Sequence, residues 1–342
     1  MNKYSKDPQF FITPVFQIHP EFIYKYGQID WLENRTMQYD RNTSNLTNNS
    51  NRNKLSSKAK SKAKKAIVYL LNCAKEKEVY NVKYNSRYKF KVSFLTLTLP
   101  TIQQHSDHEI KETCLNQLFV ELKKHYNLKH YIWKAERQRN GNIHFHILSD
   151  KYLPFKEMND RWNRIIEKLG YITEIEKVHK KRNPPTTDIH SLKKVNNVVG
   201  YILKYMIKEN ASNRGKLKRN IFSTSSKFVK GTRSLSDHVL CYLGSLATSG
   251  RIWSCSQSLS NLKGAQGILD DEINKEIESI NNKANTYTFK KSYITCLYFK
   301  PSHINEKETP ILYKLLHQFI DSLGFEHQNC DVFNGAPPAD YR

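Results

Sequence analysis

Two histidines separated by a single residue, His144 and His146, are the side chains of this chain best placed for metal chemistry. They belong to the segment 142–148, in which large apolar residues alternate with them. Side chains of a β-strand alternate between its two faces, so the segment predicts a strand with both imidazoles on one face and a core on the other. Neighbouring imidazoles can provide two ligands of a metal ion. Two solvent-facing histidines on an amphipathic strand would give the same pattern, and the rest of the chain has to decide.

A second group of reactive side chains repeats at helical spacing: Tyr201, Lys204, Tyr205 and Lys208. On a helix starting near residue 196 or 197 and ending near residue 209, these four would form one stripe opposite an apolar side. Tyrosine can act as a covalent nucleophile. Neighbouring ammonium groups favour its phenolate form and bind phosphate. The alternative is an amphipathic helix whose tyrosines only cover apolar surface.

The overall charge indicates a polyanionic partner. The 342 residues include 55 Lys and Arg against 32 Asp and Glu, a formal net charge of +23 with a pI near 9.6. Nucleic acid is favoured over a membrane, because no run of 18 apolar residues occurs and residues 1–6 lack the apolar stretch of a signal peptide. We expect a cytoplasmic protein, in the host cytoplasm if a phage encodes it. The six scattered cysteines predict reduced thiols.

A run of lysines and alanines begins near Ser56. Ala and Lys favour helix and a Ser can cap its start, so the run predicts a helix. Its lysines either form a solvated surface or contact phosphates. They are Lys58, Lys60, Lys62, Lys64 and Lys65.

The pattern of the central chain predicts an α+β domain. Expected strands at 89–99, 131–136, 142–148 and 171–178 alternate with expected helices at 108–125 and 155–168. This βαββαβ order predicts an RRM- or ferredoxin-like antiparallel sheet with helices on one face. We expect residues 1–54 to be an N-terminal extension and polar linker, residues 55–210 to be the domain with its basic leading helix, and residues 211–342 to be a C-terminal extension or accessory region. Within the last we expect helices at 235–247, 268–283 and 305–323 and a strand at 286–299.

Three motifs, in this order, resemble those of the HUH endonuclease superfamily. The segment 94–99 is similar to its first strand motif, Glu136 with 141–146 to its metal motif, and 201–205 to its Tyr-x-x-Lys-Tyr nucleophile motif. The closest resemblance is to two-tyrosine rolling-circle replication initiators of plasmids and of small, microvirus-like single-stranded DNA phages. It covers about residues 88–210.

The resemblance implies a DNA-nicking mechanism. His144, His146 and a third polar side chain would bind Mg²⁺ or Mn²⁺. Tyr201 or Tyr205, with Lys204 beside them, would attack single-stranded DNA at an origin, leaving a free 3′-hydroxyl and a 5′-phosphotyrosine. The other tyrosine would act in later strand transfer. The chain has no G-x-x-x-x-G-K-[ST] motif, so host helicase and polymerase would be needed.

Glu136 is the first candidate for the third ligand, and Gln138 is the second. A two-residue Asn-Gly turn would pair Arg137 with His144 and place Glu136 on the wrong face. A three-residue loop, with Gly141 in a left-handed bulge position, would instead pair Glu136 with His144. Metal binding by Glu136 therefore predicts the bulged turn.

Other functions remain as alternatives. A non-catalytic RRM-like nucleic-acid binder fits the charge and the aromatic residues, but it gives no reason for the paired histidines or tyrosines. Relaxases of the superfamily typically carry the nucleophile before the histidines, and its transposases usually have one tyrosine. A zinc hydrolase would need a third ligand at different spacing. Two histidines and a carboxylate also match oxygenase triads, which nothing else in the chain supports.

Overall fold

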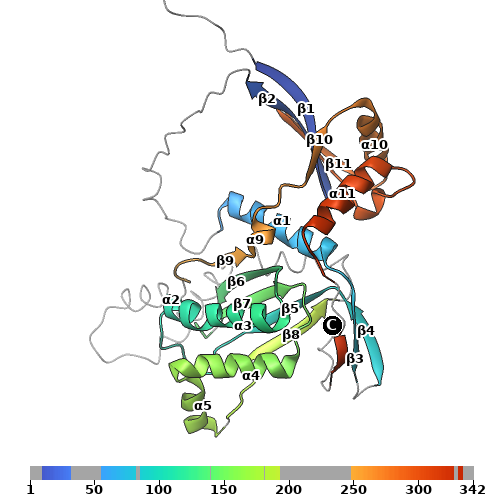
Figure 1. Ribbon diagram of the computed structural model, residues 1–342. Coiled ribbons are helices and arrows are strands. Elements are labelled where there is room, and N and C mark those ends of the chain that lie inside the picture. The colour runs from blue at the N-terminus through green and yellow to red at the C-terminus, as the bar shows by residue number, and fades with distance from the viewer. Residues whose placement is uncertain are drawn as a thin grey trace, which may run out of the picture. The chain divides into compact units, whose positions relative to one another are not determined.

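The computed structural model describes residues 10–31, 55–81, 85–138, 140–180, 182–192, 248–326 and 330–333. The chain forms two compact units (Figure 1). Unit 1 combines residues 1–48 with 261–325, and unit 2 combines 49–260 with 326–342. The helices predicted at 196–209 and 235–247 lie outside the described residues. The three segments drawn from composition stay a prediction.

The largest sheet of unit 2 is antiparallel throughout, with the order β8-β5-β7-β6-β9. Its strands are β5 (Val92–Leu97), β6 (Tyr131–Arg137), β7 (Ile143–Ser149), β8 (Thr187–Leu192) and β9 (Trp253–Cys255). Without β9, the fourth, first, third and second strands of a βαββαβ unit lie side by side, which is the ferredoxin-like arrangement. The α+β class and the antiparallel sheet are confirmed.

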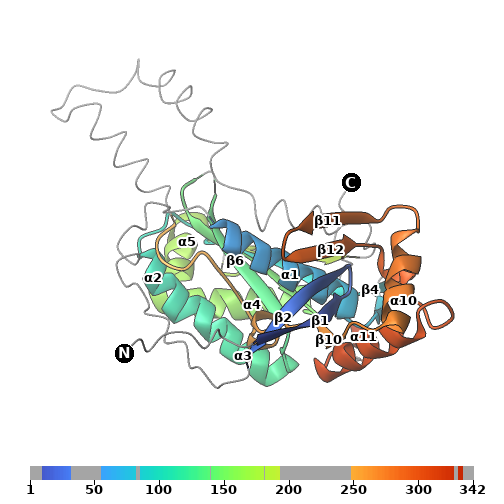
Figure 2. The ribbon, with the colours of Figure 1, turned by 90° about the horizontal axis from the view of Figure 1, so that it is seen from above.

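Helices cover one face of this sheet, as predicted. They are α2 (Asp107–Glu109), the π-helix η2 (Ile110–Leu115), α3 (Asn116–Tyr126), α4 (Phe155–Ile166), the 3₁₀ helix η3 (Glu167–Leu169) and α5 (Tyr171–His179). Their apolar side chains and those of β5 to β7 form one core around the fully buried Trp162 and Phe145. On the opposite face, α1 (Ser57–Cys73) packs against β6, β9 and the short α9 (Gln257–Ser260) (Figures 1 and 2).

The strand predicted at 171–178 is wrong, because this segment is the helix α5. Its buried residues Tyr171, Ile172 and Ile175 have helical spacing, and Gly170, at φ +79°, separates α5 from the preceding turn. The fourth strand is β8 instead. Only six residues long, β8 contains Asp188, His190 and Ser191, so it lacks the apolar alternation that marks a strand in a sequence.

The strand predicted at 89–99 is divided at Lys91. Its first part belongs to β4 (Ser86–Phe90), which lies in a three-stranded sheet with β3 (Lys77–Asn81) and β13 (Cys330–Phe333). In this small sheet β13 runs parallel to β3 and β4 antiparallel to it. The second part, β5, is buried on both faces, which accounts for the shift of apolar phase near Phe94.

Unit 1 is built on a second five-stranded antiparallel sheet, in the order β10-β1-β2-β12-β11. Its strands are β1 (Phe10–His19), β2 (Phe22–Trp31), β10 (Ala265–Ile268), β11 (Tyr287–Lys291) and β12 (Ile294–Tyr298). The helices α10 (Asp271–Asn281) and α11 (Pro310–Ser322) close a core with the sheet, and the 3₁₀ turn η5 (Pro301–His303) lies between β12 and α11. Both helices match predicted segments, whereas the hairpin of β1 and β2 was not predicted.

Two expectations from composition can be compared with the described residues. None of their helices is long and apolar enough to cross a membrane. Cys73, Cys114, Cys255 and Cys296 are free thiols, in agreement with the expected reduced state.

Candidate metal centre

The side chains of Glu136, His144 and His146 converge on one point of the unit 2 sheet. Glu136 lies on β6 and both histidines lie on β7. The Nε2 atoms of His144 and His146 are 2.9 Å apart, and they lie 3.1 and 3.0 Å from Oε1 of Glu136. Within the described residues these three form a group of side chains able to hold a metal ion.

The turn between β6 and β7 produces this convergence. Gln138 N donates to Asn142 O at 2.8 Å, Gly141 N donates to Gln138 O at 3.0 Å, and Gly141 has a φ of +89°. The strand register pairs Glu136 with His144. The predicted three-residue loop with a left-handed glycine is therefore confirmed, and the two-residue turn is excluded.

Burial and neighbouring charges tune these groups. His144 and His146 are 8% and 6% exposed. Burial would raise the pKa of Glu136, but hydrogen bonds to both histidines and the charge of Lys134 hold it well below its usual range. Lys134 Nζ lies 3.3 Å from Oε2 of Glu136, so the carboxylate has a cation at one oxygen and two imidazoles at the other. Burial lowers the pKa of His146, which favours the neutral imidazole that binds metals.

The spacing of the three ligand atoms suits an octahedral ion. Ligands about 2.1 Å from an ion and at right angles to one another lie about 3 Å apart, whereas a tetrahedral ion would separate them by about 3.4 Å. The separations of 2.9, 3.0 and 3.1 Å match the first value. Mg²⁺ and Mn²⁺ prefer octahedral coordination. The residues therefore fit a divalent ion held by one triangular face.

Sequence reasoning missed two side chains beside the triad. Thr96 Oγ1 lies 3.1 Å from Nδ1 of His146, a contact that fixes the ring and leaves Nε2 facing Glu136. Lys134 precedes Glu136 by two residues, so the period of a strand places both on the same face. That period was the available signal for Lys134. Thr96 could be found only from the pairing of β5 with β7.

The basic helix has the predicted start. Ser56 Oγ accepts a hydrogen bond from Ala59 N at 3.1 Å and caps α1. Among its lysines, Lys58, Lys62 and Lys64 are exposed, whereas Lys60 and Lys65 are half-buried. Burial lowers the pKa of Lys65. The helix lies on the face of the sheet that carries the histidines.

The predicted nucleophile segment cannot be compared with the metal centre. Tyr201, Lys204, Tyr205 and Lys208 all lie outside the described residues. Their roles stay predictions from the sequence.

A family model described as replication-associated protein ORF2 matches residues 92–210. The match includes β5 to β8, the metal centre and the segment with Tyr201 and Tyr205. Comparison with curated proteins found no match, and comparison with solved structures found none either. The match indicates a replication-associated protein that binds DNA, consistent with an initiator of rolling-circle replication.

Proposed function

We propose that this chain initiates rolling-circle replication by nicking single-stranded DNA at an origin, as a metal-dependent HUH-type endonuclease and strand transferase. The convergence of Glu136, His144 and His146 within a region that matches a replication-associated family carries the proposal. The order of the motifs, with the tyrosines after the histidines, supports a two-tyrosine initiator over a relaxase.

The protein residues divide the work. Glu136, His144 and His146 would hold the ion, with Thr96 orienting His146. A bound Mg²⁺ or Mn²⁺ would stabilise charge on the oxygens of the scissile phosphate. One tyrosine Oη, from Tyr201 or Tyr205, forms a bond to phosphorus while the bond to the 3′ oxygen breaks. That oxygen takes up a proton and becomes the 3′-hydroxyl primer.

Later strand transfer reverses this chemistry. A 3′-hydroxyl attacks the phosphotyrosine, the phosphodiester re-forms and the tyrosine regains its proton. The energy of the bond is conserved in the covalent intermediate, so no ATP is needed for this step. Host helicase and polymerase would extend the primer.

A covalent-adduct assay tests the proposal. The full chain is incubated with Mn²⁺ and single-stranded DNA from the replicon that encodes it, then analysed on a denaturing gel. We expect an adduct with the wild type, and none with H144A or with the double variant Y201F/Y205F. The single variants Y201F and Y205F assign the first and second nucleophiles.

Two results would contradict the proposal in different ways. An adduct that persists in Y201F/Y205F would reject the tyrosine assignment. A wild-type protein that binds the DNA tightly but gives no adduct on any fragment would favour the non-catalytic binder.

A further inference from the structure

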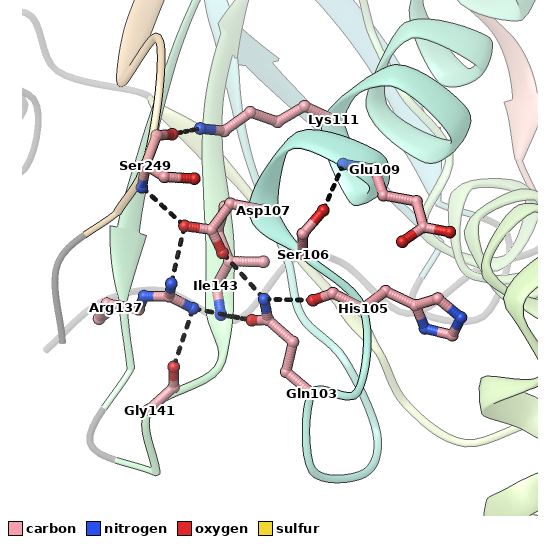
Figure 3. A network of polar contacts seen from close by, with 10 residues as sticks. All are labelled: Gln103, His105, Ser106, Asp107, Glu109, Lys111, Arg137, Gly141, Ile143 and Ser249. Carbon is pink, nitrogen blue, oxygen red and sulfur yellow. Dashed lines mark hydrogen bonds and ion pairs between the residues drawn. The ribbon is translucent and has the colours of Figure 1, made fainter. Parts of the chain in front are cut away.

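A buried carboxamide, that of Gln103, joins the β6–β7 turn to the loop that follows β5 (Figure 3). Gln103 Oε1 accepts hydrogen bonds from Ile143 N at 2.7 Å and from Arg137 Nη1 at 2.9 Å. Its Nε2 donates to Asp107 Oδ1 at 2.8 Å and to His105 O at 2.9 Å. Four bonds use the amide fully and leave it one orientation.

Gln103 substitutes for a missing strand. Arg137 and Ile143 form a pair between the hydrogen-bonded pairs of β6 and β7, so Ile143 N points away from β6 and toward β5. But β5 ends at Leu97, opposite Phe145, and offers Ile143 no backbone partner. The side chain of Gln103 takes that place. Beside it, Asn142 accepts from Gln103 N at 2.9 Å and donates to Thr101 O at 2.6 Å.

Asp107 anchors the same corner from the helix side. It is 3% exposed, and its Oδ2 accepts from Arg137 Nη2 at 2.7 Å and from Ser249 N at 2.8 Å. Arg137 Nη1 also donates to Gly141 O, inside the turn, at 3.1 Å. The guanidinium therefore connects a buried carboxylate to the turn itself.

These contacts are compatible with only one register. The sequence Asn140-Gly141 favours a two-residue turn, which would place Arg137 opposite His144 and on the face of the metal centre. Arg137 would then leave Asp107, and Glu136 would leave the histidines. Local turn preference thus opposes the register that the metal centre needs.

We propose that Gln103 and Asp107 are positioning residues that select the register in which Glu136 meets His144. Neither touches the ligand atoms. They act through Arg137 and Ile143, which adjoin Glu136 and His144 in the chain. This inference rests on the proposed metal centre, and it assigns that centre a support from a loop outside the two strands.

Mn²⁺ affinity of the full chain provides the first test. Loss of an outer partner of a metal ligand typically weakens binding about 10- to 100-fold, and we expect this for Q103M and D107N. The control E121Q removes a carboxylate that pairs with Arg161 and Arg164 between α3 and α4, away from the turn. We expect E121Q to bind Mn²⁺ as the wild type does.

A double-variant comparison separates register from general stability. In the wild-type background, E136Q removes a ligand and weakens Mn²⁺ binding. In the Q103M or D107N background, Glu136 has already left the centre, so E136Q should weaken binding no further. An equal effect of E136Q in all three backgrounds would overturn the proposal.

The register itself can be measured without metal. Antiparallel strands bring Hα atoms together at non-hydrogen-bonded pairs, so the wild type should give a nuclear Overhauser effect between Arg137 Hα and Ile143 Hα. In Q103M and D107N it should be replaced by one between Gln138 and Ile143. Retention of the wild-type contact in both variants would reject the positioning role. If the wild type binds no Mn²⁺, the proposed metal centre fails, and this measurement still decides the role of Gln103 and Asp107.

Discussion

The two units use the same kind of scaffold but carry very different charge. Each has a five-stranded antiparallel sheet with helices packed against it. Unit 1 contains 13 Lys and Arg residues against 13 Asp and Glu residues, whereas unit 2 contains 42 against 19. The whole excess of positive charge therefore belongs to unit 2, together with the triad of Glu136, His144 and His146. We expect metal chemistry and phosphate contacts to depend on unit 2 alone.

The largest difference should appear when a histidine is removed from each unit. H146A takes away one of three ligands and should weaken Mn²⁺ binding by more than the roughly 100-fold that loss of an outer partner can cost. H317A, on the exposed side of α11 in unit 1, should leave it unchanged. Isothermal titration calorimetry measures both. Equal losses would mean that the metal binds elsewhere.

A core truncation in unit 1 should affect stability without affecting the metal. Leu312 is fully buried in the core formed by α10, α11 and their sheet. L312A should lower the free energy of unfolding of unit 1 by about 2–5 kcal/mol, through lost burial and the cavity left behind. Urea denaturation followed by circular dichroism provides the measurement. A parallel loss of Mn²⁺ affinity in the absence of urea would show that the units are not independent.

Charge reversal should distinguish the units in DNA binding. K58E/K62E removes two exposed cations from α1, whereas K290E/K291E does the same on β11 of unit 1. Each lost phosphate contact should reduce the slope of log affinity against log salt by about 0.7 for single strands. We expect a change near 1.4 for the first variant and none for the second, measured by fluorescence anisotropy. The reverse result would place the DNA on unit 1.

The smallest expected effect concerns an acidic residue of the basic unit. Burial would raise the pKa of Glu121, but hydrogen bonds from Arg164, Gln117 and Arg161 lower it to about 2. A carboxyl group with a lowered folded-state pKa stabilises the protein above its ordinary pKa, near 4.5, and loses that effect as the pH falls toward 2. E121Q should cost about 1 kcal/mol at pH 7, since solvent screens the exposed Arg164. The deficit should shrink below pH 4.5 in acid-denaturation curves, and a constant deficit would contradict the assignment.

The metal centre could be predicted because its geometry is local. A strand period of two and a five-residue separation between Arg137 and Asn142 were enough to link the identity of the third ligand to one turn. The choice between the two possible turns was not local. It depends on Gln103 and Asp107, which lie 30 or more residues from the turn and which no pattern connects to it.

The remaining errors have the same origin. Alternation at 171–178 suggested a strand, because Tyr171, Ile172 and Ile175 satisfy a short strand pattern nearly as well as a helical one. The segment 187–192 becomes a strand by pairing with β5, not by its own apolar pattern. Likewise β1 and β2 pair with β10 and β12, from the far end of the chain. Long-range pairing leaves little signal in a single sequence.

The path of the chain between the units has a consequence for biosynthesis. The chain enters unit 1 first, then forms most of unit 2, and returns to complete the first sheet only at β10 and β12. More than 230 residues separate β2 from β10. At about 5–20 residues per second, a ribosome would need roughly 10–50 s to produce them. Throughout this interval the nascent β1–β2 hairpin has two unpaired edges and only marginal stability, so the first element to leave the exit tunnel is among the last to be secured.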